Sequence, residues 1–292
     1  MDDVLIKFAA YVARHMGSTH IYFVHIAQSL DMPKELAKNY RDVLAPIDET
    51  ICHDLKLKIK ELIKLPESCD FSVEVHEGNA NDKLLKIVRR KDADVVVLGS
   101  KRTMPGQGAL AKKLVKSLHR SVVLVPEVLP KRMDQILVAI DFSRHSKLAL
   151  EKAIILKEAS DTPVDIMCYH VYELPSGWSH TGKSEREFSE IMRGHAEKRY
   201  QEFIQEFPEE YHNIPCVFRA DDNRNPVKEI YSQAVDIQAD LIIVGSKGKS
   251  AAAAMLMGSV AERLAHRNHE IPLLIVKDKN ENIGFLEALF KI

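Results

Sequence analysis

The sequence predicts an α/β protein made of two tandem, doubly wound, parallel-sheet domains, the first of which lacks its opening strand. Three observations support this fold class: an internal repeat, short apolar strands that alternate with helices, and a strand in the second copy that has no counterpart in the first. The chain has 292 residues, which agrees with two domains at roughly 150 residues each.

The internal repeat is visible in two separate pairs of segments. Residues 93–101 (ADVVVLGSK) match residues 239–247 (ADLIIVGSK) at an offset of 146, and residues 5–26 align without gaps with residues 150–171 at an offset of 145. Because both matches keep almost the same offset, a duplicated domain explains them better than chance similarity between apolar strands.

The repeat also divides the chain. We expect a first domain at 1–128, a second domain at 133–278 and a C-terminal tail at 279–292, with Pro126–Pro130 opening the linker between the domains. The tail carries apolar residues at helical spacing over 282–292. It is expected to pack against the body of the protein, and a helix that binds a partner is the alternative.

Short runs of Val, Ile and Leu predict buried strands, which are typical of a parallel sheet covered on both faces. In chain order these strands are 21–26, 73–76, 95–98, 122–125, 136–140, 166–171, 217–219, 241–244 and 273–276. Helical patterns lie between them at 148–157, 185–207 and 227–235. Such alternation predicts right-handed crossovers and a doubly wound sheet.

The two copies differ at their starts. In the second copy, the strand 136–140 leads into Asp141 before the first helix begins. At an offset of 145, the equivalent of Asp141 would fall before Met1. The sheet of the first copy is therefore expected to be one strand short, unless the gap is filled in some other way.

Composition excludes several classes of function. Lys and Arg total 41 against 42 for Asp and Glu, so the chain lacks the positive charge of a general nucleic-acid-binding protein. No apolar run approaches the roughly 18 residues of a membrane span. The acidic start Met1-Asp2-Asp3 is unlike a basic secretory signal, and the four cysteines form no CxxC pair. We expect a cytoplasmic protein with free thiols.

The strongest chemical signal is a group of glycines after the strand 241–244. Gly245 and Gly248 are followed, after nine intervening residues, by Gly258 and Ser259, and a good helix continues from there. Glycines at the carboxyl end of a strand let backbone N–H groups approach a phosphate, and a helix N-terminus adds a positive dipole end. The alternative is that these glycines serve only as turn residues.

Other phosphate-binding motifs fit this segment less well. A P-loop would need a further glycine five residues before Gly248, where Ile243 stands inside a strand. No GxGxxG follows a strand, so the dinucleotide fingerprint is absent from the sequence.

The spacing Gly-x2-Gly-x9-Gly-Ser at 245–259, with ILVAIDFS at 136–143 and GSVAER at 258–263, resembles the ATP-binding members of the universal stress protein family. The resemblance covers the whole second half and, more weakly, the first. It implies a tandem universal stress protein that binds ATP or another adenine nucleotide in its second domain, with Mg²⁺ as a possible companion ion.

The resemblance also implies a set of binding residues. Asp141 would face the base and ribose, Val171 would contact adenine through its backbone, and the glycines and Ser259 would hold the phosphates and ribose. Neighbouring residues would line the base side and flank the pocket. The full set is Ala139, Ile140, Asp141, Val171, Val244, Gly245, Gly248, Gly258, Ser259 and Val260.

The first copy departs from this pattern at each point. Arg102 stands at the position of Gly248, and Lys112 and Lys113 stand at those of Gly258 and Ser259. A degenerate structural domain is expected. The alternative is that these three cations hold some other anion by charge rather than through the backbone.

Candidate residues for other chemistry are weak. No histidine or cysteine cluster has metal-ligand spacing, and no serine or cysteine has the context of a nucleophile, so no catalytic or metal residue is assigned. His25 and His170 end equivalent strands and are expected to pack in the core or at the pocket rim. The loop 172–183, which holds Trp178, either closes over a nucleotide or is a plain surface loop.

The expected function is nucleotide-dependent regulation in a stress response, through a protein partner that the sequence does not identify. Two alternatives stand beside it: a slow ATP hydrolase on the same site, and a nucleotide-free scaffold that acts through its pseudo-dimer interface. The family commonly dimerises through its last strand. A tandem chain could satisfy that surface internally between 122–125 and 273–276, which leaves a further homodimer open.

Overall fold

The computed structural model describes residues 1–30, 47–100, 107–175, 177–221, 225–249, 257–268 and 270–279. The helices are α1 (Asp2–His15), α3 (Ile47–Leu62), α4 (Ala80–Arg90), α5 (Gln107–Ser117), α6 (Arg144–Glu158), α7 (Glu185–Ile204), α8 (Pro226–Asp236) and α9 (Ser259–Arg267), with 3-10 turns η1 (Trp178–Thr181) and η2 (Glu209–Tyr211). The strands are β1 (His20–Ala27), β2 (Asp70–Glu77), β3 (Val95–Gly99), β4 (Ser121–Val125), β5 (Gln135–Ala139), β6 (Asp165–Tyr172), β7 (Cys216–Ala220), β8 (Leu241–Gly245) and β9 (Leu273–Val276).

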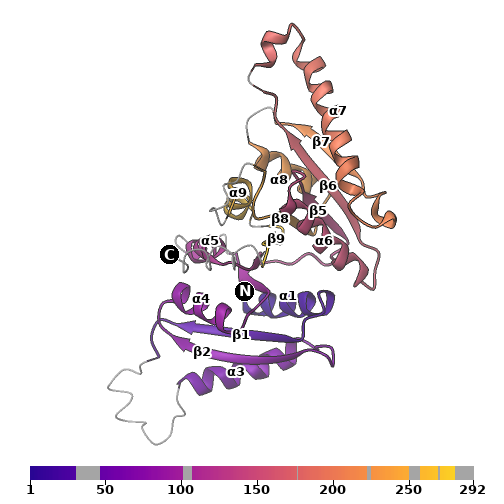
Figure 1. Cartoon of the computed structure of the whole chain (residues 1–292). Helices are drawn as coiled ribbons and strands as arrows, with labels where there is room; N and C mark the ends of the chain where they lie inside the picture. Colours follow the sequence, from indigo (N-terminus) through magenta and orange to yellow (C-terminus); the bar gives the residue numbers. More distant parts are fainter. Residues whose placement is uncertain are drawn as a thin grey trace, which may run out of the picture.

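The described strands form two sheets. The larger has seven strands in the order β3-β4-β9-β8-β5-β6-β7, and the smaller pairs β1 with β2. Every neighbouring pair is parallel except β4 and β9. Helices cover the faces of the strands and connect them, so the α/β fold class with parallel sheets is confirmed (Figure 1).

The last strands of the two halves join them. Val122, Val123 and Leu124 of β4 pair antiparallel with Ile275, Leu274 and Leu273 of β9. All residues of both strands are buried. The larger sheet therefore runs continuously from the first half into the second, and the internal pairing considered for a tandem chain is the one that the structure has.

The missing opening strand of the first half leaves its sheet divided. In the second half, β5 lies between β6 and β8. In the first half, β1 and β3 are the equivalents of β6 and β8, yet no described strand lies between them. The pair β1-β2 consequently lies apart from the larger sheet (Figure 1).

Apolar residues build two cores, one on each face of the larger sheet. Alternate residues of the buried strands point to opposite faces: Val138 and Ile243 belong to one core, and Leu137 and Ile242 belong to the other. α6 buries Ala149, Leu150 and Ala153 against the first of these cores.

Local sequence signals explain where the helices begin and end. Ser184 caps α7 and forms a capping box with Glu187, which satisfies backbone N–H groups at the helix start. α7 ends at Ile204, three residues earlier than the pattern 185–207 suggested, and Pro208 follows the turn that closes it. No helix in the described part of the chain is long and apolar enough to cross a membrane.

Candidate functional site

The predicted site lies where the carboxyl ends of β5 and β8 meet the start of α9. Such an edge is where open α/β sheets bind ligands. Asp141 follows β5 by two residues, and its backbone N–H donates to Ser146 Oγ over 2.9 Å. Ser146 Oγ in turn donates to Asp141 Oδ1 over 2.6 Å, and the Ser143 N–H donates to the same oxygen over 3.0 Å. These bonds fix the carboxylate in one orientation at the start of α6.

The other oxygen of Asp141 holds the glycine loop. The backbone N–H of Lys249 donates to Asp141 Oδ2 over 2.8 Å. A Cβ added at Gly248 would stand 2.6 Å from this oxygen, closer than any real Cβ contact. Glycine at 248 is therefore required for the loop to close onto Asp141.

Gly245 has a different structural role. A Cβ at this position would lie 2.7 Å from the carbonyl carbon, the oxygen and the Cβ of His145 in α6. The end of β8 thus touches the backbone at the start of α6, and only glycine leaves room for this approach. Ser246, which follows, is 1% exposed and donates its N–H to Val276 O over 2.8 Å.

The start of α9 completes the edge. Gly258 is the N-cap residue, and its N–H donates to Ser246 O over 2.6 Å, which holds the helix start against the end of β8. Ser259 is exposed and Val260 is half-buried. The first turn of an α-helix leaves backbone N–H groups without partners inside the helix, and these groups and the helix dipole favour an anion.

Residues from β5 and β6 form the other side of the site. Ala139 and Ile140 are buried, Val244 is buried beside them in β8, and Val171 is half-buried near the end of β6. The Ile140 N–H donates to Tyr169 O over 2.9 Å, so the carboxyl ends of both strands stay paired up to the site. The structure thus places every residue of the predicted set at one edge of the sheet.

His170 packs at the rim of this edge, as expected. Its Nδ1 lies 2.9 Å from Ile140 O, and its ring lies 4.3 Å from the ring of Phe142. Burial lowers the pKa of His170, so the neutral imidazole is favoured. The equivalent His25 of the first half is exposed, so the expectation that it also packs in the core or at a pocket rim is wrong.

Phe142 is a residue that the sequence pattern missed. It has a φ of +62°, a conformation that side chains rarely adopt. The guanidinium carbon of Arg199 lies 4.7 Å from its ring centroid and Lys249 Nζ lies 5.3 Å from it. The ring therefore gathers two cations beside Asp141 and the glycine loop. Only the position of Phe142 directly after Asp141 could have pointed to it.

Asp221 is a second residue that was missed. It follows β7 at the same edge of the sheet and is 7% exposed. Its Oδ1 accepts from the Asn225 N–H over 2.7 Å, while its Oδ2 has no hydrogen-bond partner among the described atoms. Asp221 could not be singled out from the sequence, because it begins a run of polar residues at 221–225 and the pattern does not indicate which of them is buried.

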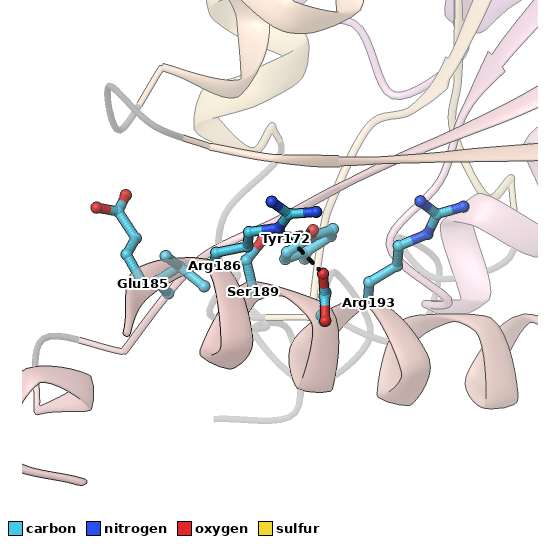
Figure 2. A pocket seen from close by; sticks show the side chains of 7 residues that line it. Tyr172, Glu185, Arg186, Ser189 and Arg193 are labelled. Carbon is cyan, nitrogen blue, oxygen red and sulfur yellow. Dashed lines mark hydrogen bonds and ion pairs between the residues drawn. The ribbon is translucent and has the colours of Figure 1, made fainter. Parts of the chain in front are cut away.

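A small cavity of about 450 Å³ lies beside this edge, between β6 and α7. In Figure 2, Tyr172 lies between the side chains of Arg186 and Arg193, which project from α7. Tyr172 and Ser189 share a hydrogen bond of 3.0 Å, and Arg186 pairs with Glu190. The loop after Tyr172 contains η1 with the half-buried Trp178. This arrangement does not decide whether the loop closes over a nucleotide or is a plain surface loop.

The first half offers a different edge. Its helix α5 begins at Gln107, so Lys112 and Lys113 lie within the helix rather than at its start. Their N–H groups are therefore used in the helix and are not available to an anion. Lys112 is half-buried and Lys113 is exposed. Arg102 lies outside the described residues, as does the tail 282–292. The hypothesis of another anion at these three cations stays a prediction.

The cysteines and acidic residues give no sign of other chemistry. All four cysteines are free thiols. Burial raises the pKa of Cys168 to about 12, which suppresses its reactive thiolate form. In the described part of the chain, no group of three or more His, Cys, Asp or Glu side chains is placed to hold a metal ion.

Comparison with solved structures supports the fold. A universal stress protein from Pseudomonas aeruginosa UCBPP-PA14, described as putative, aligns with a TM-score of 0.62 at 15% identity, over 98% of this chain and 92% of that one. A universal stress protein from Archaeoglobus fulgidus aligns with a TM-score of 0.53 at 18% identity, over 96% of this chain and 91% of that one. At this identity the likeness shows the fold alone.

Curated relatives are found at the sequence level. Universal stress protein Rv2623 of Mycobacterium tuberculosis is 31% identical over 186 residues, which are 60% of this chain and 59% of the relative. Universal stress protein Mb2028c of Mycobacterium bovis is 28% identical over 207 residues, which are 64% of this chain and 62% of the relative. The matches thus span less than two thirds of the length of these relatives.

The model of the universal stress protein family matches the chain twice, at residues 2–126 and 133–277. Both halves of the internal repeat are covered, including the first, where the glycine pattern is lost. With the parallel α/β fold described above, these two matches show that the chain belongs to the universal stress protein family.

Proposed function

We propose that the second half of the chain binds ATP or another adenine nucleotide, and that the bound nucleotide regulates a cytoplasmic stress-response function of the protein. The observation that carries the proposal is the joint position of Asp141, Gly248 and the start of α9 at one edge of the sheet. At this edge, the loop that contains Gly248 lies against the carboxylate of Asp141, and the chain then reaches the N-terminus of α9.

The chemistry of this edge suits a nucleotide. A helix N-terminus favours phosphate. The cations Lys249 and Arg199 lie against the ring of Phe142, which directly follows Asp141. The buried Ala139 and Ile140 and the half-buried Val171 would line the side of the site that receives the base. Family membership supports the regulatory role in stress.

A companion Mg²⁺ would be held mainly by the nucleotide. Mg²⁺ is usually bound through one or two carboxylates together with phosphate oxygens and water. The carboxylate of Asp141 already accepts bonds from Ser143, Ser146 and Lys249. The exposed Ser259 at the start of α9 is the protein group best placed to approach the phosphate end. The ion would supply charge neutralisation of the phosphates.

Calorimetric titration with ATP tests the proposal. Gly248→Arg copies the residue of the first half and fills the space beside Asp141 Oδ2, so we expect affinity to fall by about 100-fold or more. Gly194→Arg is the matched control, because Gly194 is exposed on α7 and has open space at its Cβ. It should leave affinity unchanged.

Two results would contradict nucleotide binding: no heat with ATP or ADP on the unmodified chain, or equal affinity in Gly248→Arg. The regulatory part needs a separate measurement. In the source organism, a strain that carries Gly248→Arg should survive stress as poorly as a strain without the protein. Normal survival of the Gly248→Arg strain would favour the nucleotide-free scaffold.

A further inference from the structure

Two cations of the second half lie over one aromatic ring at the carboxyl edge of the larger sheet. Arg199 belongs to α7, Lys249 belongs to the loop that follows β8, and the ring is that of Phe142, close to the end of β5. The guanidinium carbon of Arg199 lies 4.7 Å from the ring centroid, and Lys249 Nζ lies 5.3 Å from it. One ring therefore brings together positive charges from two segments that are far apart in the sequence.

The ring is held in a fixed position. Phe142 has a φ of +62°, a conformation that costs free energy for a residue with a Cβ and persists where the surrounding structure imposes it. The centroid of its ring lies 4.3 Å from that of His170 and 5.8 Å from that of Phe203. The backbone N–H of Lys249 donates to Asp141 Oδ2 over 2.8 Å. The ring and the backbone that carries Lys249 are therefore both anchored beside Asp141.

Neither cation forms an ion pair with a carboxylate in the part of the chain that the structure describes. Both oxygens of Asp141 already accept hydrogen bonds, and Lys249 reaches one of them through its backbone rather than through its ammonium group. Other cations on α6 and α7 do have carboxylate partners: Arg144 with Asp278, Lys147 with Glu206, and Arg193 with Glu197. Arg199 and Lys249 thus form a positive pair at the sheet edge, and such a pair favours an anionic ligand.

The pair is open to a ligand from solvent. Arg199 and Lys249 are exposed, and Phe142 is half-buried beneath them. An aromatic ring attracts a cation through its face but accepts no strong hydrogen bond. The N–H donors of both cations therefore remain available to an anion.

The chemistry of the pair suits a phosphate group better than a carboxylate. A guanidinium presents a planar fork of donors that matches two phosphate oxygens, and an ammonium on a flexible stem can reach a further oxygen. A carboxylate has two oxygens and one negative charge, so it satisfies one of the two cations. The pair also lies at the same edge of the sheet as the start of α9, where the proposed nucleotide places a phosphate.

We propose that Arg199 and Lys249 form a second phosphate-binding position of the second half, in addition to the start of α9. This inference rests on the proposed nucleotide site. It makes that site selective for adenine nucleotides that carry several phosphates, such as ATP, over AMP. It also gives α7, which lies outside the glycine motif, a direct role in ligand selection through Arg199.

Calorimetric titration of the full chain with ATP and with AMP tests the proposal. The unmodified chain should bind ATP at least about tenfold more tightly than AMP, because charge-assisted hydrogen bonds hold the additional phosphates. Arg199→Gln with Lys249→Gln should bring this ratio close to one, through weaker binding of ATP. Arg186→Gln with Arg193→Gln is the matched control, since it removes two cations of α7 that already pair with Glu190 and Glu197. It should leave the ratio unchanged.

The outcomes separate this inference from the proposed function. If the unmodified chain binds ATP and AMP equally tightly, or if the Arg199→Gln, Lys249→Gln variant keeps the preference for ATP, the second phosphate position is overturned while the nucleotide site stands. If no nucleotide binds at all, the proposed function fails, and inorganic pyrophosphate then tests the cation pair by itself.

His170 provides the readout for pyrophosphate. Burial is the main cause that lowers the pKa of His170, and the positive charge of Arg199 lowers it further. An anion bound to Arg199 offsets that charge, so inorganic pyrophosphate should raise the pKa of His170 in an NMR titration of the unmodified chain. The same addition should leave this pKa unchanged in the Arg199→Gln, Lys249→Gln variant. No rise in the unmodified chain would show that the cation pair does not bind phosphate.

Discussion

The two halves of this chain share a strand framework and differ at the carboxyl edge of the sheet. Ser246 donates its N–H to Val276 O over 2.8 Å, and Ser100 makes the equivalent bond to Val125 O over 2.7 Å. After these serines the halves diverge. α9 begins at Ser259, whereas α5 begins at Gln107, six residues before the position equivalent to Ser259.

This difference shows that fold and site are determined by different residues. Apolar strands and the β4–β9 pairing require only buried Val, Leu and Ile, which both copies retain. An anion site requires a helix to start at the sheet edge and a glycine to face Asp141. The first half has this strand framework without the glycine pattern, which makes it an internal control for the site proposed in the second half.

The largest expected effect on stability compares the equivalent glycines Gly245 and Gly99. Gly245→Ala forces a Cβ to 2.7 Å from backbone atoms of His145, which cannot move without shifting α6. Thermal or denaturant unfolding should show a loss of about 3 kcal/mol. Gly99→Ala meets only the flexible side chain of Met1, at 2.9 Å, and should cost under about 1 kcal/mol. Equal losses would show that the two edges are packed alike.

The next-largest expected effect concerns Lys277. This residue directly follows β9, as Pro126 directly follows β4 in the first half. Its buried Nζ lies 2.6 Å from both Val115 O and Leu118 O, at the junction of the halves. Burial first, and then the nearby charge of Lys247, lower the pKa of Lys277 to about 8, from 10.5. Between these values the unfolded chain binds more protons than the folded one, so this group makes stability rise with pH.

Lys277→Met should remove that rise. Relative to the variant, the unmodified protein should gain about 2 kcal/mol of unfolding free energy between pH 8 and pH 10, since one pKa unit corresponds to about 1.4 kcal/mol. Denaturant unfolding of both proteins across this range measures the difference. A constant difference would mean that Lys277 stays charged in the folded protein.

Asp141→Asn should have a smaller effect on stability. The Asn amide keeps one acceptor oxygen, but its NH₂ group then faces the N–H donor of either Lys249 or Ser143, with which it cannot form a hydrogen bond. Loss of one such bond costs about 1 to 2 kcal/mol, and release of the glycine loop should weaken ATP binding by about tenfold. Unfolding and calorimetry measure the two effects. An Asn variant with unchanged affinity would show that Asp141 does not hold the loop for the ligand.

The smallest effect is expected at an ion pair that crosses between the halves. Lys116 of α5 lies 2.5 Å from Glu262 of α9, and the Lys116 side chain is 50% exposed. Exposed pairs contribute little, so Lys116→Ala should change stability by less than about 0.5 kcal/mol. A larger loss in thermal unfolding would mean that contact between α5 and α9, beyond the β4–β9 pairing, joins the halves.

Much of the fold could be predicted from the sequence. Short, continuous apolar runs such as 241–244 and 273–276 are typical of strands that are buried on both faces of a parallel sheet. Strand partners could not be predicted this way. Periodicity does not tell that β1 and β2 separate from β3, which they do because no strand in the described part of the chain lies between them. The separation of the two sheets therefore became visible only in three dimensions.

The candidate site divides in the same manner. The glycine spacing and Asp141 were predicted, because backbone approach demands residues without a Cβ and these stand out in a sequence. The bond from Lys249 N to Asp141, the left-handed Phe142 and the buried Asp221 were not. Each depends on how a loop turns after its strand, and no residue pattern encodes that turn.

We propose that the second half of the chain binds a nucleotide and that the first half does not. Native mass spectrometry of the full chain with saturating ATP counts the bound nucleotides directly. We predict one nucleotide per chain, and none in Gly248→Arg. Two nucleotides per chain would show that the first half binds as well and would contradict the account, and none on the unmodified chain would show that the glycine motif serves only the fold.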